Sequence, residues 1–143
     1  DVYKRQMPTG NMRATDYRFM PLIRMACTCI GNGDQSVNEI IKDVKNGYYI
    51  SNMKVPSIDM NRYNWNISCQ YAQKIENGEI TDLLRDVIVM GTAPEFFNSI
   101  DACGNDFTVR PITNCGKGDP MQSMMMGNGG PTIRGTAIVK SVN

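Results

Sequence analysis

The amino-acid sequence predicts an α+β domain made mostly of antiparallel β-sheet, and three observations support this prediction. Apolar and polar residues alternate along several stretches, which is the pattern of half-buried strands. An Asn-Gly turn joins two of these stretches and favours a β-hairpin. Helix signals occur only in two places, at about 36–46 and about 94–101. The length of 143 residues fits one domain.

The first half of the chain contains the clearer helix. Apolar residues alternate around 22–30, which predicts a strand. Ser36 and Glu39 then have the spacing of a capping box, and the apolar residues that follow share one helical face. Gly47 can adopt the left-handed conformation that ends a helix. We therefore expect one clear helix over about 36–46.

The central part predicts three strands. The first covers 48–55, and Pro56 is expected to break it because proline cannot donate a ladder hydrogen bond. Side chains alternate again in 65–75. The Asn-Gly turn follows and leads into 80–90, so we expect these last two stretches to pair as a hairpin.

The last third predicts a short helix and two strands. Pro94 suits the first turn of a helix over about 94–101. Strands are expected at 106–112 and at 132–142, where apolar and β-branched residues gather. No repeat and no dividing linker is visible, so one domain is the expectation.

Composition narrows the possible partners. The chain is 41% apolar and 20% charged, with a formal net charge of +1, as in ordinary globular proteins. No strongly basic surface is expected, so we expect no nucleic-acid partner. The uninterrupted apolar runs are only a few residues long, so we expect no membrane partner and a cytoplasmic location.

The chain has five cysteines and no histidine. An odd number of cysteines at irregular spacings argues against a secreted disulfide framework. Without histidine the chain cannot build a Ser-His-Asp or Cys-His pair, or the common two-histidine zinc site. Any site of these kinds must take its histidines from elsewhere.

The first six residues, "DVYKRQ", are expected to be foreign to the protein. One codon spelling of them matches a transposon end used to prepare sequencing libraries. We therefore interpret 1–6 as a sequencing-adapter scar and leave it out of the fold prediction. The alternative is a natural basic, polar N-terminus. On the scar interpretation, the gene continues upstream of Met7.

Cys115 is the strongest candidate for chemistry, because it stands among glycines and near a lysine in "CGKG". Gly116 permits a close backbone approach. The charge of Lys117 favours the thiolate, which is the form that binds metals or attacks as a nucleophile. A metal ligand is the better functional interpretation, because no histidine is available as a base. The alternative is a structural cysteine in a Gly-rich loop.

Three neighbouring patterns favour structure over chemistry. Four methionines could suggest a copper(I) site, but successive strand residues point to opposite faces, so core or contact packing is favoured. "GNGGP" lacks the Lys-Ser end of a phosphate loop and is interpreted as a tight turn. Three aspartates beside glycine or proline suit turns better than a hydrolase pair. The methionines are Met121, Met124, Met125 and Met126, the "GNGGP" segment is 127–131, and the aspartates are Asp101, Asp106 and Asp119.

Several short motifs occur together in a recognisable order. They are "PLIRM" (21–25), "KNGYYI" (45–50), "IENGEIT" (75–81), "GND" (104–106), "CGKGDPMQ" (115–122) and "GNGGPTIRG" (127–135). In this order they resemble the C-terminal part of TldD/PmbA proteins, zinc metallopeptidases also described as modulators of DNA gyrase. The likeness covers nearly everything after residue 6, and its most specific motif is the Cys-Gly-Lys element.

The resemblance implies that 7–143 is the C-terminal domain of a TldD-like metallopeptidase whose N-terminal part is missing. In TldD-like members, an earlier His-Glu-x-x-x-His helix supplies two zinc-ligand histidines and an acid/base glutamate. A cysteine at the position of Cys115 completes the zinc site, with Gly116 and Lys117 as possible support. No catalytic residue is then expected in this chain, which alone would neither bind zinc tightly nor cleave peptides.

The resemblance also implies substrates and partners. TldD-like enzymes would cleave peptides or unfolded protein segments and form a homo- or heterodimer with a family member. The alternative is a non-catalytic partner subunit of a TldD/PmbA-type heterodimer. A third interpretation, a modulator of gyrase, finds no basic nucleic-acid surface here. The chain departs from many relatives at 55–69 and at Asn128, where some carry histidine, so no role is transferred to these positions.

Overall fold

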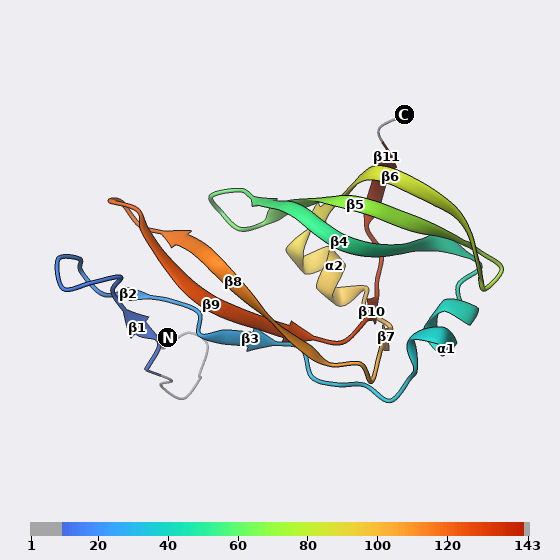
Figure 1. Ribbon diagram of the computed structural model, residues 1–143, viewed down its shortest axis with the longest axis horizontal. Helices are drawn as coiled ribbons and strands as arrows, with labels where there is room; N and C mark the ends of the chain where they lie inside the picture. Colours follow the sequence, from blue (N-terminus) through green and yellow to red (C-terminus); the bar gives the residue numbers. More distant parts are fainter. Residues whose placement is uncertain (1–9, 142–143) are drawn as a thin grey trace. The chain divides into compact units, whose positions relative to one another are not determined.

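The computed structural model describes residues 10–141 and confirms an α+β fold made mostly of antiparallel sheet (Figure 1). The expected scar, 1–6, lies outside the described residues. The strands are β1 (Met12–Arg13), β2 (Leu22–Ile23), β3 (Cys27–Cys29), β4 (Asn46–Ile58), β5 (Asn64–Glu76), β6 (Glu79–Thr92), β7 (Ala102–Cys103), β8 (Thr108–Lys117), β9 (Gln122–Gly130), β10 (Ile133–Arg134) and β11 (Ile138–Ser141). The helices are α1 (Val37–Lys42) and α2 (Ala93–Asn98).

The described chain divides into two compact units, each assembled from two separate segments. Unit 1 contains the described residues up to Gly31 together with Thr108–Gly130. Unit 2 contains Asn32–Phe107 together with the described residues from Pro131 onward. Unit 1 therefore holds β1, β2, β3, β8 and β9, and unit 2 holds both helices and the remaining strands.

The main sheet of unit 2 has the strand order β11-β6-β5-β4, and all its neighbours are antiparallel. The predicted central hairpin is confirmed, because Ile75 pairs with Ile80 next to the turn. Asn77 and Gly78 have φ values of 49° and 82°. Two successive left-handed residues are the signature of the tight turn that Asn-Gly favours.

The predicted break at Pro56 is wrong, because β4 continues through this residue to Ile58. The strand lies at the edge of the sheet and pairs only with β5. An edge strand has one unpaired side, which tolerates the missing N–H of proline. The strand is also irregular here, since its register with β5 shifts between Met53 and Val55.

Both helices are present but shorter than predicted. The capping box of Ser36 and Glu39 is formed, yet α1 ends at Lys42 rather than near 46. The residues after α1 bind the β5-β6 turn instead, because the carbonyls of Val44 and Lys45 accept hydrogen bonds from the backbone N–H groups of Gly78 and Asn77. Helix α2 ends at Asn98 rather than near 101, and β7 begins shortly afterwards.

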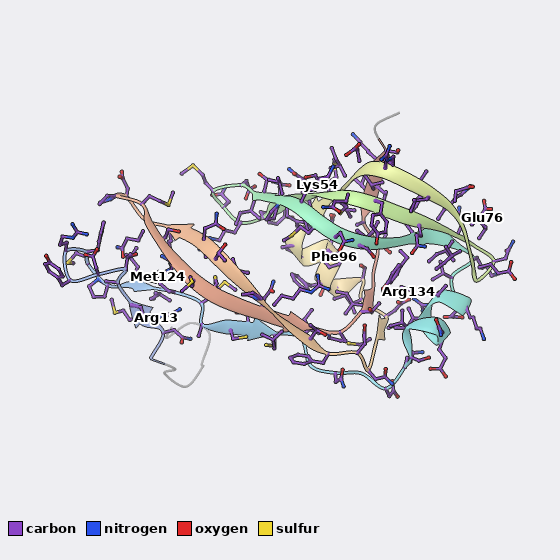
Figure 2. The ribbon with its side chains drawn as sticks, viewed as in Figure 1. Arg13, Lys54, Glu76, Phe96, Met124 and Arg134 are labelled. Carbon is purple, nitrogen blue, oxygen red and sulfur yellow. The ribbon has the colours of Figure 1, made fainter. Side chains whose placement is uncertain are left out.

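The apolar core lies in unit 2, between β5 and β6. A cluster of four buried residues, Cys69, Ala72, Val87 and Val89, forms its centre. Trp65 packs against this cluster and meets Phe96 of α2 edge to face, with ring centroids 5.2 Å apart. Figure 2 shows Phe96 on the helix that covers this sheet. All buried apolar residues of the described chain belong to unit 2.

Unit 1 contains a three-stranded sheet in the order β3-β9-β8 and a small antiparallel pair, β1-β2. Strands β8 and β9 form an antiparallel hairpin, whereas β3 runs parallel to β9. The single strand predicted at 22–30 is therefore two short strands, because β2 pairs with β1 and β3 pairs with β9. The tight turn predicted at 127–131 is wrong, since Gly127–Gly130 ends β9, and residues 127–129 are paired with both β3 and β8.

The last predicted strand, 132–142, is also divided. Its first part is β10, which pairs with β7, and its second part is β11, which pairs with β6.

The chain passes close to Ser99 between these two strands. Gly135 follows β10, and a Cβ atom there would lie 3.2 Å from the hydroxyl oxygen of Ser99. Among residues 10–141, neither helix is long and apolar enough to cross a membrane.

Candidate functional site

Cys115 lies on β8, close to the tip of the β8-β9 hairpin of unit 1 (Figure 1). It stands in a strand, so the expected Gly-rich loop is wrong at this residue. Cys115 pairs with Met124, and the register is irregular between Ile112 and Cys115. The hairpin turn follows Lys117 and includes Gly118, with φ of 95°. The paired backbone of the hairpin, rather than a loose loop, therefore sets the position of this thiol.

Arg24 binds the backbone of this part of the hairpin through its side chain. Its side chain is only 4% exposed. The guanidinium donates one hydrogen bond to the carbonyl of Cys115 and another, of 2.9 Å, to the carbonyl of Gln122. One buried cation thus joins β8 and β9 at the position of the candidate ligand. The sequence prediction missed this role, although an arginine among alternating apolar residues was a signal for it.

Gln122 continues the same network. It is 4% exposed, and its amide donates to the carbonyl of Met20 at 2.9 Å. Its side-chain oxygen accepts from the backbone N–H of Thr15 at 3.2 Å. Both residues that are buried in unit 1, Arg24 and Gln122, are therefore polar and hydrogen-bonded to main chain. These bonds anchor the segment 15–24 to the hairpin that carries Cys115.

Lys117 contacts the neighbouring segment through its ammonium group. The Nζ atom donates to the carbonyl of Ile23 at 2.8 Å, so the side chain links β8 to β2. Cys115 and Lys117 are two residues apart in one strand, which places their side chains on the same face. The expected position of a cation near the thiol thus agrees with the strand geometry, and the ammonium also has a structural partner.

Gly116 and the methionines shape the surroundings of the hairpin tip. A Cβ atom on Gly116 would lie 2.8 Å from the sulfur of Met121, so this glycine allows a close approach. Met125 is exposed, whereas Met124 and Met126 are half-buried. This alternation along β9 confirms that the consecutive methionines point to opposite faces, and Figure 2 labels Met124 among them.

A zinc ion would find a suitable donor in Cys115 but not a complete set of ligands. The thiol is free and half-buried, and thiolate sulfur is a normal zinc ligand. Within residues 10–141, however, no group of three or more cysteines, aspartates or glutamates is arranged to hold a metal ion. The donor type fits zinc, and a zinc ion at Cys115 would need further ligands from outside the described residues.

Two of the predicted turn aspartates form structural contacts in unit 2. The carboxylate of Asp101 accepts a 2.7 Å hydrogen bond from Nε of Arg134, which lowers the pKa of this carboxyl group. Asp106 accepts from the backbone N–H and the hydroxyl of Thr132, both at 2.8 Å, and these bonds lower its pKa. Asp119 lies in the turn of the β8-β9 hairpin of unit 1.

The other four cysteines differ in their exposure. Cys69 is buried in the core, and burial raises the pKa of its thiol. Cys103 is half-buried in unit 2. Cys27 and Cys29 of β3 are exposed, with their sulfur atoms 3.5 Å apart. The sequence prediction gave no role to this pair, although two cysteines at Cys-x-Cys spacing in a strand lie on the same face.

Comparison with known proteins identifies relatives along nearly the whole chain. The family model described as "PmbA/TldA metallopeptidase C-terminal domain" matches residues 3–141. A metalloprotease of Methanothermobacter thermautotrophicus is 32% identical over 127 residues, which are 89% of this chain and 27% of that protein. A zinc metalloprotease TldD homolog of Saccharolobus solfataricus is 33% identical over 133 residues, which are 93% of this chain and 29% of that protein.

A solved structure shares the fold. The crystal structure of TldE from Thermococcus kodakarensis superimposes with a TM-score of 0.69 at 21% sequence identity. The match covers 96% of this chain and 28% of the TldE chain. The present chain thus spans less than a third of the length of each of these relatives.

Proposed function

Because this chain belongs to the PmbA/TldA metallopeptidase C-terminal domain family, we propose that it is part of a zinc-dependent peptidase in which Cys115 is a metal ligand. The observation that carries the proposal is the fixed, half-buried thiol on β8. Its backbone is held by buried Arg24, so the sulfur has a defined position. The naming of relatives as metalloproteases supports the reaction class.

The proposed zinc site is shared between this domain and another part of the intact protein. Two histidines from that part and the thiolate of Cys115 would leave one coordination position open. When bound, zinc supplies a Lewis acid and an activated water for peptide hydrolysis. The present chain lacks histidine entirely, so its own contribution is a single ligand and the scaffold around it.

The residues around Cys115 are proposed to position the thiolate. Arg24 joins the carbonyls of Cys115 and Gln122 and so fixes the two strands in register. Lys117 links β8 to β2 and places its ammonium group on the same face of the strand as the thiol. Gly116 allows Met121 to approach the strand closely.

The ligand role is tested in the full-length protein that carries this domain. Cys115→Ala should lower the zinc bound per chain by at least about tenfold under limiting zinc, because one of three protein ligands is lost. Peptide hydrolysis should fall in parallel. The measurements are metal analysis by mass spectrometry and cleavage of an unfolded protein substrate, with circular dichroism to verify folding.

Cys103→Ala is the matched control, because Cys103 is also half-buried but lies on β7 of unit 2. This variant should keep its zinc. If Cys115→Ala retains full zinc occupancy while folded, Cys115 is not a ligand and the proposal fails.

We further propose that the intact protein is cytoplasmic, cleaves peptides or unfolded protein segments, and forms a dimer with a family member. The alternative is a non-catalytic subunit of a TldD/PmbA-type pair. The full gene distinguishes the two. A His-Glu-x-x-x-His motif upstream of the domain supports the peptidase, whereas its absence supports the non-catalytic subunit.

A further inference from the structure

Two thiols lie side by side on a strand that Figure 1 shows along one edge of the β3-β9-β8 sheet. Cys27 and Cys29 are two residues apart in β3, so their side chains share one face. Both are exposed, and their sulfur atoms are 3.5 Å apart. The strand thus presents a pair of adjacent sulfur donors to solvent.

The neighbouring strand leaves room for these sulfurs. Cys27 is in register with Gly127 of β9, and Cys29 is in register with Gly129. A Cβ atom on Gly127 would lie 3.2 Å from the sulfur of Cys27. A larger side chain at this position would crowd the thiol, so glycine at Gly127 keeps the sulfur accessible beside the neighbouring strand.

The geometry of the pair suits a shared cation better than a disulfide. Two residues apart in an extended strand, the Cα atoms are roughly 6.6 Å apart, at the upper end of the range that disulfides span. A tetrahedral cation with metal–sulfur bonds of about 2.3 Å holds two thiolates about 3.8 Å apart. The observed separation of 3.5 Å is close to that value and far from an S–S bond.

We propose that Cys27 and Cys29 form a two-thiolate site for a thiophilic divalent cation of the zinc–cadmium class. The two sulfurs act as a chelate, and water or an added ligand completes the coordination. Thiolates are the donors that such soft or borderline ions prefer. This site does not depend on the proposed role of Cys115, which lies on a different strand of unit 1.

The test uses the reduced 143-residue chain and Cd²⁺ as the probe. We expect an ultraviolet thiolate-to-cadmium charge-transfer band that saturates near about one Cd²⁺ per chain. Cys27→Ser and Cys29→Ser should each weaken Cd²⁺ binding by at least about tenfold, because each removes one arm of the chelate. Cys103→Ser is the control that keeps the band.

A second measurement on the parent chain avoids any folding defect of the variants. Cd²⁺ should protect Cys27 and Cys29 together from alkylation, as mapped by peptide mass spectrometry. Alkylation of both at unchanged rates, or a band that survives both serine variants, would overturn the proposal. The proposal also fails if the reduced chain gives no band with Cd²⁺ but forms a Cys27–Cys29 disulfide with a mild oxidant.

Discussion

Arg24 connects its own segment to the β8-β9 hairpin, which carries Cys115 and lies far along the sequence. Its guanidinium is buried and donates to the carbonyls of Cys115 and Gln122. The sequence identified Cys115 as a candidate ligand, because the Cys-Gly-Lys pattern is local. It could not identify Arg24, because the convergence of two distant carbonyls on one side chain is a property of the folded sheet.

We predict that Arg24→Met lowers the free energy of unfolding by at least about 2 kcal/mol, because two main-chain carbonyls lose a buried charged donor. Arg18→Met is the control in the same unit, since Arg18 is exposed, forms its ion pair with half-buried Asp16, and otherwise lies 5.8 Å from the ring centroid of exposed Tyr17. It should change stability by less than about 1 kcal/mol. Urea unfolding followed by circular dichroism measures both, and equal effects would contradict the prediction.

At the scale of elements, the sequence located most strands and both helices but not their ends. The Asn-Gly hairpin was predictable because its turn residues and alternation are local signals. The continuation of β4 through Pro56 was not, because only the sheet order shows that this strand is at an edge. The early end of α1 likewise depends on hydrogen bonds from a turn that lies far along the chain.

The β5-β6 turn provides a test at this scale. Gly78 has φ of 82°, and an added Cβ would lie 2.5 Å from the carbonyl oxygen of Lys42. We therefore predict that Gly78→Ala destabilises the chain by about 2 kcal/mol or more, through strain and a clash with backbone. A Cβ on Gly31 would meet no atom within 4 Å, so Gly31→Ala should be nearly neutral. Thermal unfolding of the two variants compares them, and similar midpoints would refute this.

The ion pair between Arg134 and Asp101 should make the free energy of unfolding depend on pH in the acidic range. Arg134, labelled in Figure 2, donates to Asp101 and Asp43. The hydrogen bond from Arg134 lowers the pKa of Asp101. The contribution of Asp101 is therefore fully present above its unfolded pKa of about 3.9 and is lost as the pH falls through the lower folded pKa.

We expect Asp101→Asn to reduce the loss of stability between about pH 4.5 and pH 2, because the variant has no carboxylate to protonate at this position. The free energy of unfolding, measured with urea at a series of pH values, gives the slope for each protein. The same slope in parent and variant would show that this pair does not contribute.

At the scale of the whole molecule, the two units are stabilised differently. The buried apolar residues belong to unit 2, whereas the two buried residues of unit 1 are Arg24 and Gln122. The sequence predicted a single domain from its length and from the lack of a linker. It could not show two units, because each is assembled from segments that the other unit separates.

Hydrogen exchange should reveal this difference. Backbone amides of β5 and β6 flank the apolar cluster and should exchange at least about tenfold more slowly than those of β8 and β9, which lack such a core. Mass spectrometry of peptides after deuterium labelling measures both regions in the same sample. Equal protection of the two hairpins would contradict the expected difference in local stability.

The interleaved arrangement of unit 1 has a consequence for synthesis on the ribosome. Strand β3 precedes unit 2 in the sequence, but its partner β9 extends to Gly130 and follows residues 32–107 of that unit. Arg24 can likewise donate to the carbonyls of Cys115 and Gln122 only after both residues have been synthesised. The main hairpin of unit 2 can form during this interval, since its strands are adjacent in sequence. Cys115 would therefore reach its final position only after the β5-β6 hairpin has had time to form.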